Sequence, residues 1–427
     1  MNHRTVESDG YRWVMLVLYL LIATSIWLSW FAQAALLQEY WGKVYHIDVS
    51  TGNLLLSLPG LVAIFLGMSF GRWTDVYGIR RVLGLGGILA TIGFGLRPFF
   101  MTSFDTQVVL TVIGGFGIVA LTSTLAPTMI QWFGHKAAHI YIGIGAGIYF
   151  IGAGLGLLLT SALIGSIGVQ GTFTIWSILL VVTTVLWCVF ARNRQGFVSE
   201  EKGSLIAEFR TVMQTRSAWI GLIESVFIGG APVFVMGFLP MQMVVIHKLP
   251  PSLAGIIVGL LSIALGLGTA VLPSLAGHWG RKRLAVIIGA VTLIVWMIYM
   301  VLPSGIPIAG LILFALLLGF FYEAPWPLGL TVQEHLPGVT SRNVGVMSGL
   351  WTMTTNVGVF ILPLIEGAMV DRFKIEGGMW SILIVYLFFW VALLFVKERR
   401  EGVLVEKKAQ AFGGGDNWKV DEAGGEA

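Results

Sequence analysis

Long apolar runs separated by short polar segments fill almost the whole chain. Each run has roughly the 20 mostly apolar residues that a helix needs to cross a bilayer. Segments of ~10 alternating residues, which are typical of membrane β-barrels, do not occur. The pattern therefore predicts twelve spanning helices, at 13–37, 51–71, 82–102, 107–131, 139–163, 171–190, 218–243, 252–276, 284–302, 308–330, 344–369 and 379–396.

The first of these runs has to be distinguished from a targeting signal. The apolar core of a signal peptide has only ~7–15 residues, and the run 13–37 is longer than that. We therefore expect it to be the first spanning helix of the mature protein.

The composition of the chain agrees with a membrane environment. Of its 427 residues, 56% are hydrophobic and 11% are charged, whereas a typical soluble domain has about 25% charged residues. A soluble fold could not hide that much apolar surface from water. The chain is therefore expected to be an all-α polytopic membrane protein.

The basic residues and the single cysteine bear on whether the chain binds nucleic acid or a metal. A sequence pI of about 9.1 could indicate nucleic-acid binding, but the basic residues lie in short loops, which a membrane orientation explains better. One cysteine, Cys188, permits neither an internal disulfide nor a metal site of thiolates. No nucleic acid, metal or cofactor is expected.

The distribution of Lys and Arg predicts the orientation in the membrane, because cytoplasmic loops carry an excess of these residues. With a cytoplasmic N-terminus, all but five of the 26 fall on the cytoplasmic side. The exceptions are Lys43, Arg97, Lys248, Arg372 and Lys374. We therefore predict a multi-pass protein of the plasma (inner) membrane with both termini in the cytoplasm.

Two segments are too polar to span and divide the chain. The charged segment 191–217 predicts a cytoplasmic linker with a short amphipathic helix near 204–213. The tail 397–427 is charged and then Gly-rich, which is typical of disorder. Two six-helix bundles, 1–190 and 218–396, are expected on either side of the linker.

The two halves show internal similarity at one constant offset. A basic loop in each half aligns without a gap, with Gly78, Arg80 and Arg81 on Gly280, Lys282 and Arg283. The same offset places three glycines of one predicted helix on three of another, namely Gly143, Gly147 and Gly156 on Gly345, Gly349 and Gly358. Because many transporters are built from internal repeats, we interpret the similarity as a duplication.

Several glycines form GxxxG pairs within the predicted helices. Small residues let helices pack closely in lipid, where no hydrophobic drive holds helices together. Close packing alone explains such pairs, and smooth faces along which helices slide explain them as well. The pairs are Gly67/Gly71, Gly143/Gly147, Gly152/Gly156 and Gly345/Gly349.

The loop between the second and third predicted helices carries a motif. It reads Gly71-Arg72-Trp73-Thr74-Asp75-Val76-Tyr77-Gly78-Ile79-Arg80-Arg81. The spacing of Gly71, Asp75, Gly78 and Arg80 resembles the loop motif of the major facilitator superfamily. The matching loop of the second half keeps the glycine and the basic cluster in Gly280, Lys282 and Arg283, but it has Gly277 in place of the aspartate.

The resemblance covers nearly the whole chain, together with the twelve spans, the central linker and the repeat. It implies two pseudo-symmetric six-helix bundles that rock about a central site. It also implies a secondary active transporter, a symporter or an antiporter, that moves a small-molecule solute by alternating access.

The resemblance further implies a role for Asp75. In the family this aspartate meets the positive end of the eleventh helix and latches the cytoplasmic side shut. The physical basis is the attraction of an anion to a helix N-terminus. The alternative is that Asp75 only determines topology and loop shape.

Two carboxyl groups stand out deep inside predicted spans. An ionisable side chain deep in a span costs at least ~2.5–3.5 kcal/mol on insertion scales, so it is a functional candidate. Glu323 lies in the tenth span beside Pro325 and Pro327, which interrupt the backbone hydrogen bonds. Glu224 lies about two turns from the cytoplasmic end of the seventh span. Either residue is a candidate to take up a proton or to bind a cationic group; the alternatives are a structural pair for Glu323 and an interfacial position for Glu224.

Other residues of the spans are weaker candidates for the transport pathway. Arg97 and Glu366 lie at the outer ends of the third and eleventh spans, where interfacial positions are expected. The uncharged candidates are Trp30, Gln33, Thr122, Thr124 and Asn356.

The charge of the solute stays open. Members of the resembled family that carry nitrate or carboxylates use a basic residue in the core, and the second, eighth and eleventh spans have none. The loop at Trp132 and Phe133 nevertheless resembles that of anion-carrying branches.

Other function classes have less support in the sequence. Gly67-Met68-Ser69-Phe70-Gly71 matches the GxSxG pattern, but it lies in a predicted span, whereas a nucleophile elbow needs a strand-turn-helix. No HExxH motif or P-loop occurs, so neither an enzyme nor an ATP-driven pump is expected. The alternative is a transporter-like scaffold or sensor that binds without transport. We expect a monomer surrounded by membrane lipid, with protons as a candidate second partner.

Overall fold

We describe the protein from a computed structural model. The structure describes residues 10–397 except 195–204, 334–335, 337–338 and 340–343. The predicted disordered tail beyond Lys397 and the middle of the predicted linker lie outside the described residues.

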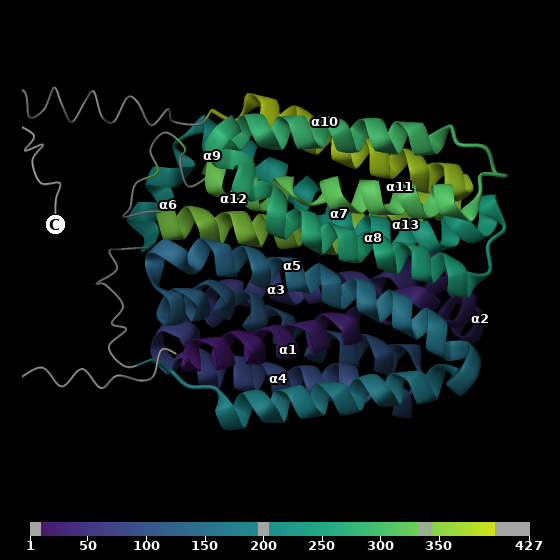
Figure 1. The fold of residues 1–427 in the computed structure, drawn as a ribbon, viewed down its shortest axis with the longest axis horizontal. Helices are drawn as coiled ribbons and strands as arrows, with labels where there is room; N and C mark the ends of the chain where they lie inside the picture. Colours follow the sequence, from purple (N-terminus) through teal and green to yellow (C-terminus); the bar gives the residue numbers. More distant parts are fainter. Residues whose placement is uncertain (1–9, 195–204, 334–335, 337–338, 340–343, 398–427) are drawn as a thin grey trace, which may run out of the picture.

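The described chain is helical and runs back and forth along one axis (Figure 1). The first half contains α1 (Tyr11–Phe31), α3 (Val49–Tyr77), α4 (Ile79–Gly95) and α5 (Phe104–Phe190). The second half contains α7 (Arg216–His247), α8 (Pro251–Val271), α10 (Arg281–Met300), α11 (Ile308–Tyr322), α12 (Pro325–Gln333) and α13 (Val344–Phe395). The short connecting elements are η1 (Ala34–Leu36), η2 (Leu37–Trp41), α2 (Gly42–Tyr45), η3 (Arg97–Phe99), α6 (Leu205–Met213), η4 (Leu272–Leu275) and α9 (Ala276–Trp279).

Breaks inside the two longest apolar segments bring the number of crossings among the described residues to twelve. Ten helical segments are long and apolar enough to cross a membrane. Two of them, Ile140–Phe190 and Met347–Phe395, have 51 and 49 residues and contain non-helical backbone at Gly168 and Lys374. Each therefore crosses twice, and the predicted number of spans is confirmed.

The turn between α3 and α4 consists of a single residue. α3 continues through Gly71 and Asp75 to Tyr77, so the loop predicted from Gly71 onward is wrong. The helix extends past its apolar run because neither glycine nor proline occurs between Gly71 and Gly78. Gly78 and its counterpart Gly280, which precedes α10, both have a φ of +81°. This left-handed backbone favours glycine and recurs at the aligned positions of both halves.

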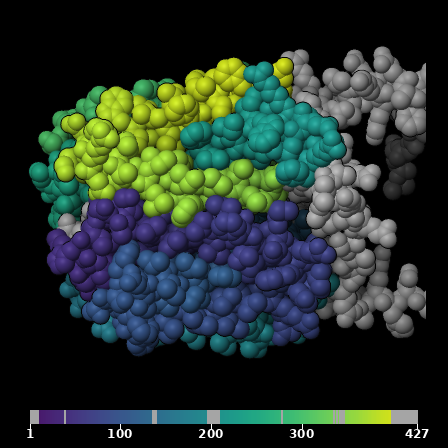
Figure 2. All heavy atoms as spheres, turned by 180° about the vertical axis from the view of Figure 1, so that it is seen from behind, coloured from purple at the N-terminus to yellow at the C-terminus, as the bar shows by residue number. Residues whose placement is uncertain are grey.

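Two six-helix bundles lie side by side, with α5 against α8 and α3 against α13 at their junction. Figure 2 shows the first part of α13 lying along α3. The short α6, which lies between the bundles in sequence, occupies the place where the linker pattern predicts an amphipathic helix.

Glycines allow a close approach at the junction. A Cβ at Gly60 of α3 would lie 2.8 Å from Cγ1 of Val359, and one at Gly147 of α5 would lie 2.6 Å from the backbone oxygen of Gly266. Real Cβ atoms do not approach so closely, so close packing explains Gly147 of the predicted GxxxG pairs. In contrast, a Cβ at Gly67, Gly71 or Gly349 would meet no atom within 4 Å.

The two ends of the molecule differ in how the halves meet. We call the end that holds Gly78 and Gly280 the basic end, and the end that holds Asp371 the opposite end. At the opposite end, Asp371 of α13 accepts the backbone N–H groups of Val49 (3.2 Å) and Ser50 (3.1 Å) at the start of α3. The open space at Gly67 and Gly71 lies on the same helix towards the basic end. Gly67 and Gly71 follow Gly60 by seven and eleven residues, so they lie on the same face of α3 as Gly60. Among the described residues, the α3–α13 junction is therefore tight at the opposite end and loose towards the basic end.

Candidate functional site

Four charged side chains are buried within the described residues. Arg97, Glu224, Glu323 and Glu366 have exposed fractions of 0%, 0%, 1% and 1%. The interfacial positions predicted for Arg97 and Glu366 are therefore wrong, as is the interfacial alternative for Glu224. α13 stays helical up to the break at Lys374, so about two turns follow Glu366 and it does not lie at the end of its span.

Arg97 is held inside the first half by hydrogen bonds. The turn η3 begins at Arg97 and directs its side chain inward instead of towards lipid headgroups. Its Nη1 donates to the backbone oxygen of Ser29 and its Nη2 donates to Oγ1 of Thr111, both at 3.0 Å. The guanidinium also lies 4.5 Å from the ring centroid of Phe94. Arg97 thus connects α1, α4 and α5, and it is a basic core residue that sequence reasoning missed.

Glu323 lies at a break in the tenth span. α11 ends at Tyr322 and α12 begins at Pro325, because the prolines that follow Glu323 cannot donate backbone hydrogen bonds. The backbone N–H of Trp326 donates to the backbone oxygen of Glu323 at 2.9 Å and closes the turn. The Oε2 atom of Glu323 is buried without a hydrogen-bond partner among the described residues. Broken helices at this depth are typical of transporter binding sites.

Glu224 on α7 lies in a second group of buried polar atoms. Gln333 at the end of α12 and Trp351 on α13 lie beside its carboxylate. Neither reaches hydrogen-bond geometry, so both oxygens of Glu224, the amide of Gln333 and the indole N–H of Trp351 have no partner among the described residues. Gly329 leaves room for this approach, since a Cβ there would lie 3.1 Å from Oε1 of Glu224.

We call Glu224, Glu323, Gln333 and Trp351 the acidic cluster. Glu323 lies just before α12 and Glu224 lies beside Gly329 of that helix, so both carboxyl groups lie along α12, and Trp326 packs against Trp351 with 5.4 Å between the ring centroids. No basic side chain is buried in the described part of the second half. Two ionised carboxylates in such surroundings are costly, and proton uptake or a bound cationic group would offset that cost. The described residues contain no group of three His, Cys, Asp or Glu side chains that could hold a metal ion.

The other predicted pathway residues do not gather at this cluster. Trp30 packs against Trp27 with ring centroids 5.0 Å apart. The amide of Gln33 donates to the backbone oxygen of Leu55 at 2.5 Å, and that of Asn356 donates to its own helix at Thr352 (2.9 Å). Thr122 and Thr124 likewise donate to backbone oxygens of their own helix. Their contacts with a solute stay predictions.

The predicted gating residues lie at the basic end. The cavity beside Asp75, of about 210 Å³, is lined by residues of the first half, among them Gln131 and Arg194. Arg80 donates from its backbone N–H to Oδ1 of Asn193 (3.0 Å) and from Nη2 to the backbone oxygen of Cys188 (2.8 Å). In the second half, Nζ of Lys282 donates to the backbone oxygen of Leu394 (2.8 Å). The basic residues therefore tie each glycine turn to the last span of the same half, and the Asp75 latch stays a prediction.

The comparison with protein families agrees with this architecture. The family model described as the Major Facilitator Superfamily matches residues 15–241 and 223–420. The chain belongs to the major facilitator superfamily. Its place in the superfamily and its similarity to transporters confirm that it is a secondary transporter and not an enzyme.

Two transport proteins are similar in sequence. The chain is 22% identical over 309 residues to the cyanate transport protein CynX of Escherichia coli (strain K12), a match that covers 71% of this chain and 77% of that protein. It is 30% identical over 127 residues to the probable anion transporter 3, chloroplastic, of Arabidopsis thaliana, covering 29% of this chain and 24% of that protein.

Solved structures of superfamily transporters share the fold. A bacterial homolog of the human lysosomal transporter Spinster, in an inward-facing and unoccupied conformation, has a TM-score of 0.71 at 15% identity and covers 91% of this chain and 97% of its own. A variant of the nucleoside transporter NupG has a TM-score of 0.68 at 15% identity and covers 90% of this chain and 98% of its own.

Proposed function

We propose that this secondary transporter is coupled to protons, which bind at the acidic cluster. The observation that carries the proposal is the pair Glu224 and Glu323, both buried along α12 with no buried basic side chain in the described part of their half. Protonation of one member relieves their repulsion, and deprotonation restores it. A gradient of protons across the membrane would then bias which member is charged.

During alternating access, the α3–α13 junction would close at one end of the molecule while it opens at the other end. The tight opposite end and the loose basic end correspond to one orientation of the pathway. In this orientation Asp371 of α13 binds the N-terminus of α3. In the other orientation, Asp75 near the far end of α3 would bind the N-terminus of α13 in the same way. The residues Gly71, Gly78, Gly280, Arg81 and Arg283 would support the turns at that end.

The excess of Lys and Arg supports a cytoplasmic basic end, with both termini in the cytoplasm, in a plasma or bacterial inner membrane. We propose that the protein works as a monomer in lipid. The segments 1–190 and 218–396 would move as two bodies joined by 191–217, with the tail 397–427 outside them.

A small anion is the solute class to test first. Both sequence relatives carry anions by name, one of them cyanate. A proton taken up with a monovalent anion makes the transported pair neutral, which fits an acidic cluster better than an anion alone. Arg97 already donates hydrogen bonds to Ser29 and Thr111. We therefore do not assign Arg97 as a binding partner of the anion.

The test uses purified protein in liposomes that contain a pH-sensitive dye. A panel that begins with cyanate and continues with carboxylates, amines, sugars and nucleosides is added outside, and the internal pH is followed. We expect one class to move protons in the wild type and in the exposed control Glu376→Gln, and not in Glu323→Gln. An unchanged proton signal in Glu323→Gln would refute the coupling role. Binding in a thermal-shift assay without movement of any solute would favour the scaffold or sensor alternative.

A further inference from the structure

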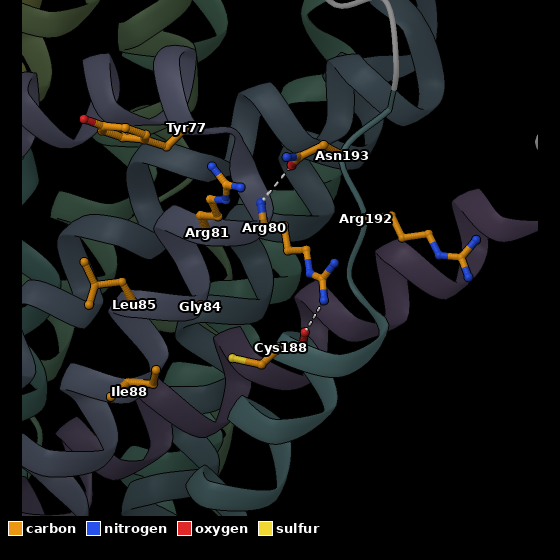
Figure 3. Close-up of a pocket in the computed structure, with 9 residues that line it drawn as sticks. All are labelled: Tyr77, Arg80, Arg81, Gly84, Leu85, Ile88, Cys188, Arg192 and Asn193. Carbon is orange, nitrogen blue, oxygen red and sulfur yellow. Dashed lines mark hydrogen bonds between the residues drawn. The ribbon is translucent and has the colours of Figure 1, made fainter.

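A groove lies on the outer side of the first half at the basic end, away from the acidic cluster. It has a volume of about 890 Å³ and lies between the start of α4 and the last span of α5 (Figure 3). The lining residues used below are Arg80, Arg81, Gly84, Leu85, Ile88 and Cys188.

The head of the groove is positively charged. Figure 3 shows the Arg80 side chain directed towards Cys188, the neighbouring Arg81 directed the other way, and Arg192 directed away from both. Arg80 uses Nη2 to bind the backbone oxygen of Cys188 (2.8 Å), and a guanidinium has further donors for an anion. Arg81 is exposed. The N-terminus of α4, which begins at Ile79, adds a partial positive charge at the same place.

The wall below the head is apolar and faces lipid. Leu85 and Ile88 are 48% and 47% exposed and belong to the candidate span Ile79–Phe99. Ile88 lies seven residues after Arg81, or about 10 Å farther along the helix axis. The groove thus carries charge at the level of the basic end and apolar surface towards the middle of the membrane.

Small residues keep the groove open. A Cβ at Gly84 would lie 3.4 Å from Sγ of Cys188, so the floor consists of a glycine facing a cysteine. In the second half, Lys282 binds the backbone oxygen of Leu394 as Arg80 binds that of Cys188. At the constant offset between the halves, the counterparts of Gly84 and Cys188 are the larger Val286 and Trp390, and Nε1 of Trp390 donates to the backbone oxygen of Val286 at 2.9 Å. Larger side chains therefore occupy the equivalent place in the second half, whereas the first half keeps the groove.

We propose that the groove binds an anionic glycerophospholipid of the surrounding leaflet. Its phosphate would lie between Arg80 and Arg81, since arginine binds phosphate through paired hydrogen bonds. One acyl chain would follow Leu85 and Ile88. A soluble anion would use only the head and a neutral lipid only the wall, so the combination favours an anionic lipid. Basic pockets between spanning helices bind anionic headgroups in this way.

Cys188 provides a built-in reporter, because it is the single cysteine of the chain and lines the groove. The protein is placed in nanodiscs of phosphatidylcholine with or without phosphatidylglycerol, and the rate of reaction with the uncharged N-ethylmaleimide is measured. Native mass spectrometry counts the phosphatidylglycerol molecules retained per chain. We expect phosphatidylglycerol to slow the reaction at Cys188 and to remain bound.

The matched variants are Arg81→Gln and Arg283→Gln. Arg283 is the aligned, exposed residue of the second half and lies outside the groove. Loss of one arginine near an anionic headgroup should weaken binding about fivefold. We expect that loss in Arg81→Gln and none in Arg283→Gln. An unchanged reaction rate of Arg81→Gln in pure phosphatidylcholine shows that the fold around Cys188 is intact.

Three results would overturn the proposal, and none depends on the transported solute. Equal protection by phosphatidylcholine and phosphatidylglycerol would show a groove that does not recognise the headgroup. Protection by inorganic phosphate in detergent, without lipid, would show a soluble-anion site. Equal weakening in Arg81→Gln and Arg283→Gln would show a diffuse effect of surface charge.

Discussion

Removal of the Asp371 carboxylate should loosen the contact between the two halves at the opposite end of the molecule. Its two oxygens accept the backbone N–H groups of Val49 and Ser50 at 3.2 and 3.1 Å. Those groups belong to the first turn of α3 and have no acceptor within the helix. The next N–H, of Thr51, is already bound by Asp48 at 2.8 Å. Asp371→Asn keeps the size of the side chain but removes its charge and one of the two acceptors.

The free-energy cost of Asp371→Asn can be estimated from the two hydrogen-bond distances. A hydrogen bond to a charged group contributes about 1.5–3 kcal/mol, but both distances are at the long end of the usual range. Asp371 is also partly exposed, so water competes for the same donors. We therefore expect the substitution to cost the closed opposite end about 1–2 kcal/mol, which shifts the equilibrium between orientations about 5–30-fold.

The assay measures the distance between the halves at the opposite end. Spin labels at Ser166→Cys and Ser304→Cys, two exposed positions in different halves, are introduced into a Cys188→Ser background. Asp371→Asn should increase the population of long distances. The control is Asp48→Asn, which changes a cap of the same helix within one half. An unchanged distance distribution in Asp371→Asn, or an equal shift in the control, would refute the reasoning.

Two further predictions concern stability. Gly60→Ala should destabilise the protein by about 1–3 kcal/mol, because its Cβ would press on Val359, whereas Gly67→Ala should be tolerated; equal thermal unfolding of the two variants would contradict this. Hydrogen bonds from Thr51 lower the pKa of Asp48 below its ordinary 3.8. The charged cap therefore stabilises α3 above the unfolded pKa and loses that effect as the pH falls through the lower folded pKa. The difference in Tm between the wild type and Asp48→Ala should shrink below about pH 4, and a difference that persists at about pH 2 would exclude this cause.

Much of the architecture could be predicted because it depends on local properties of the chain. A span requires about 20 apolar residues whatever surrounds it, so the twelve crossings follow from run lengths. The turns at Gly78 and Gly280 follow from a backbone conformation that favours glycine. The break at Glu323 follows from the prolines beside it. The family motif was recognised from residue spacing, although most of its residues lie in α3 rather than in a loop.

The partners of the charged residues were decided only by the tertiary structure. Whether Arg97 or Glu366 faces lipid or protein depends on the rotation of its helix and on its neighbours, which hydropathy does not report. Glu224 meets Gln333 and Trp351 from helices more than 100 residues away in sequence. The bond between Asp371 and the start of α3 likewise depends on how the two halves pack. The sequence by itself therefore determines the spanning helices, because in lipid a long apolar run must form a helix. The acidic cluster depends on which faces of these helices pack together.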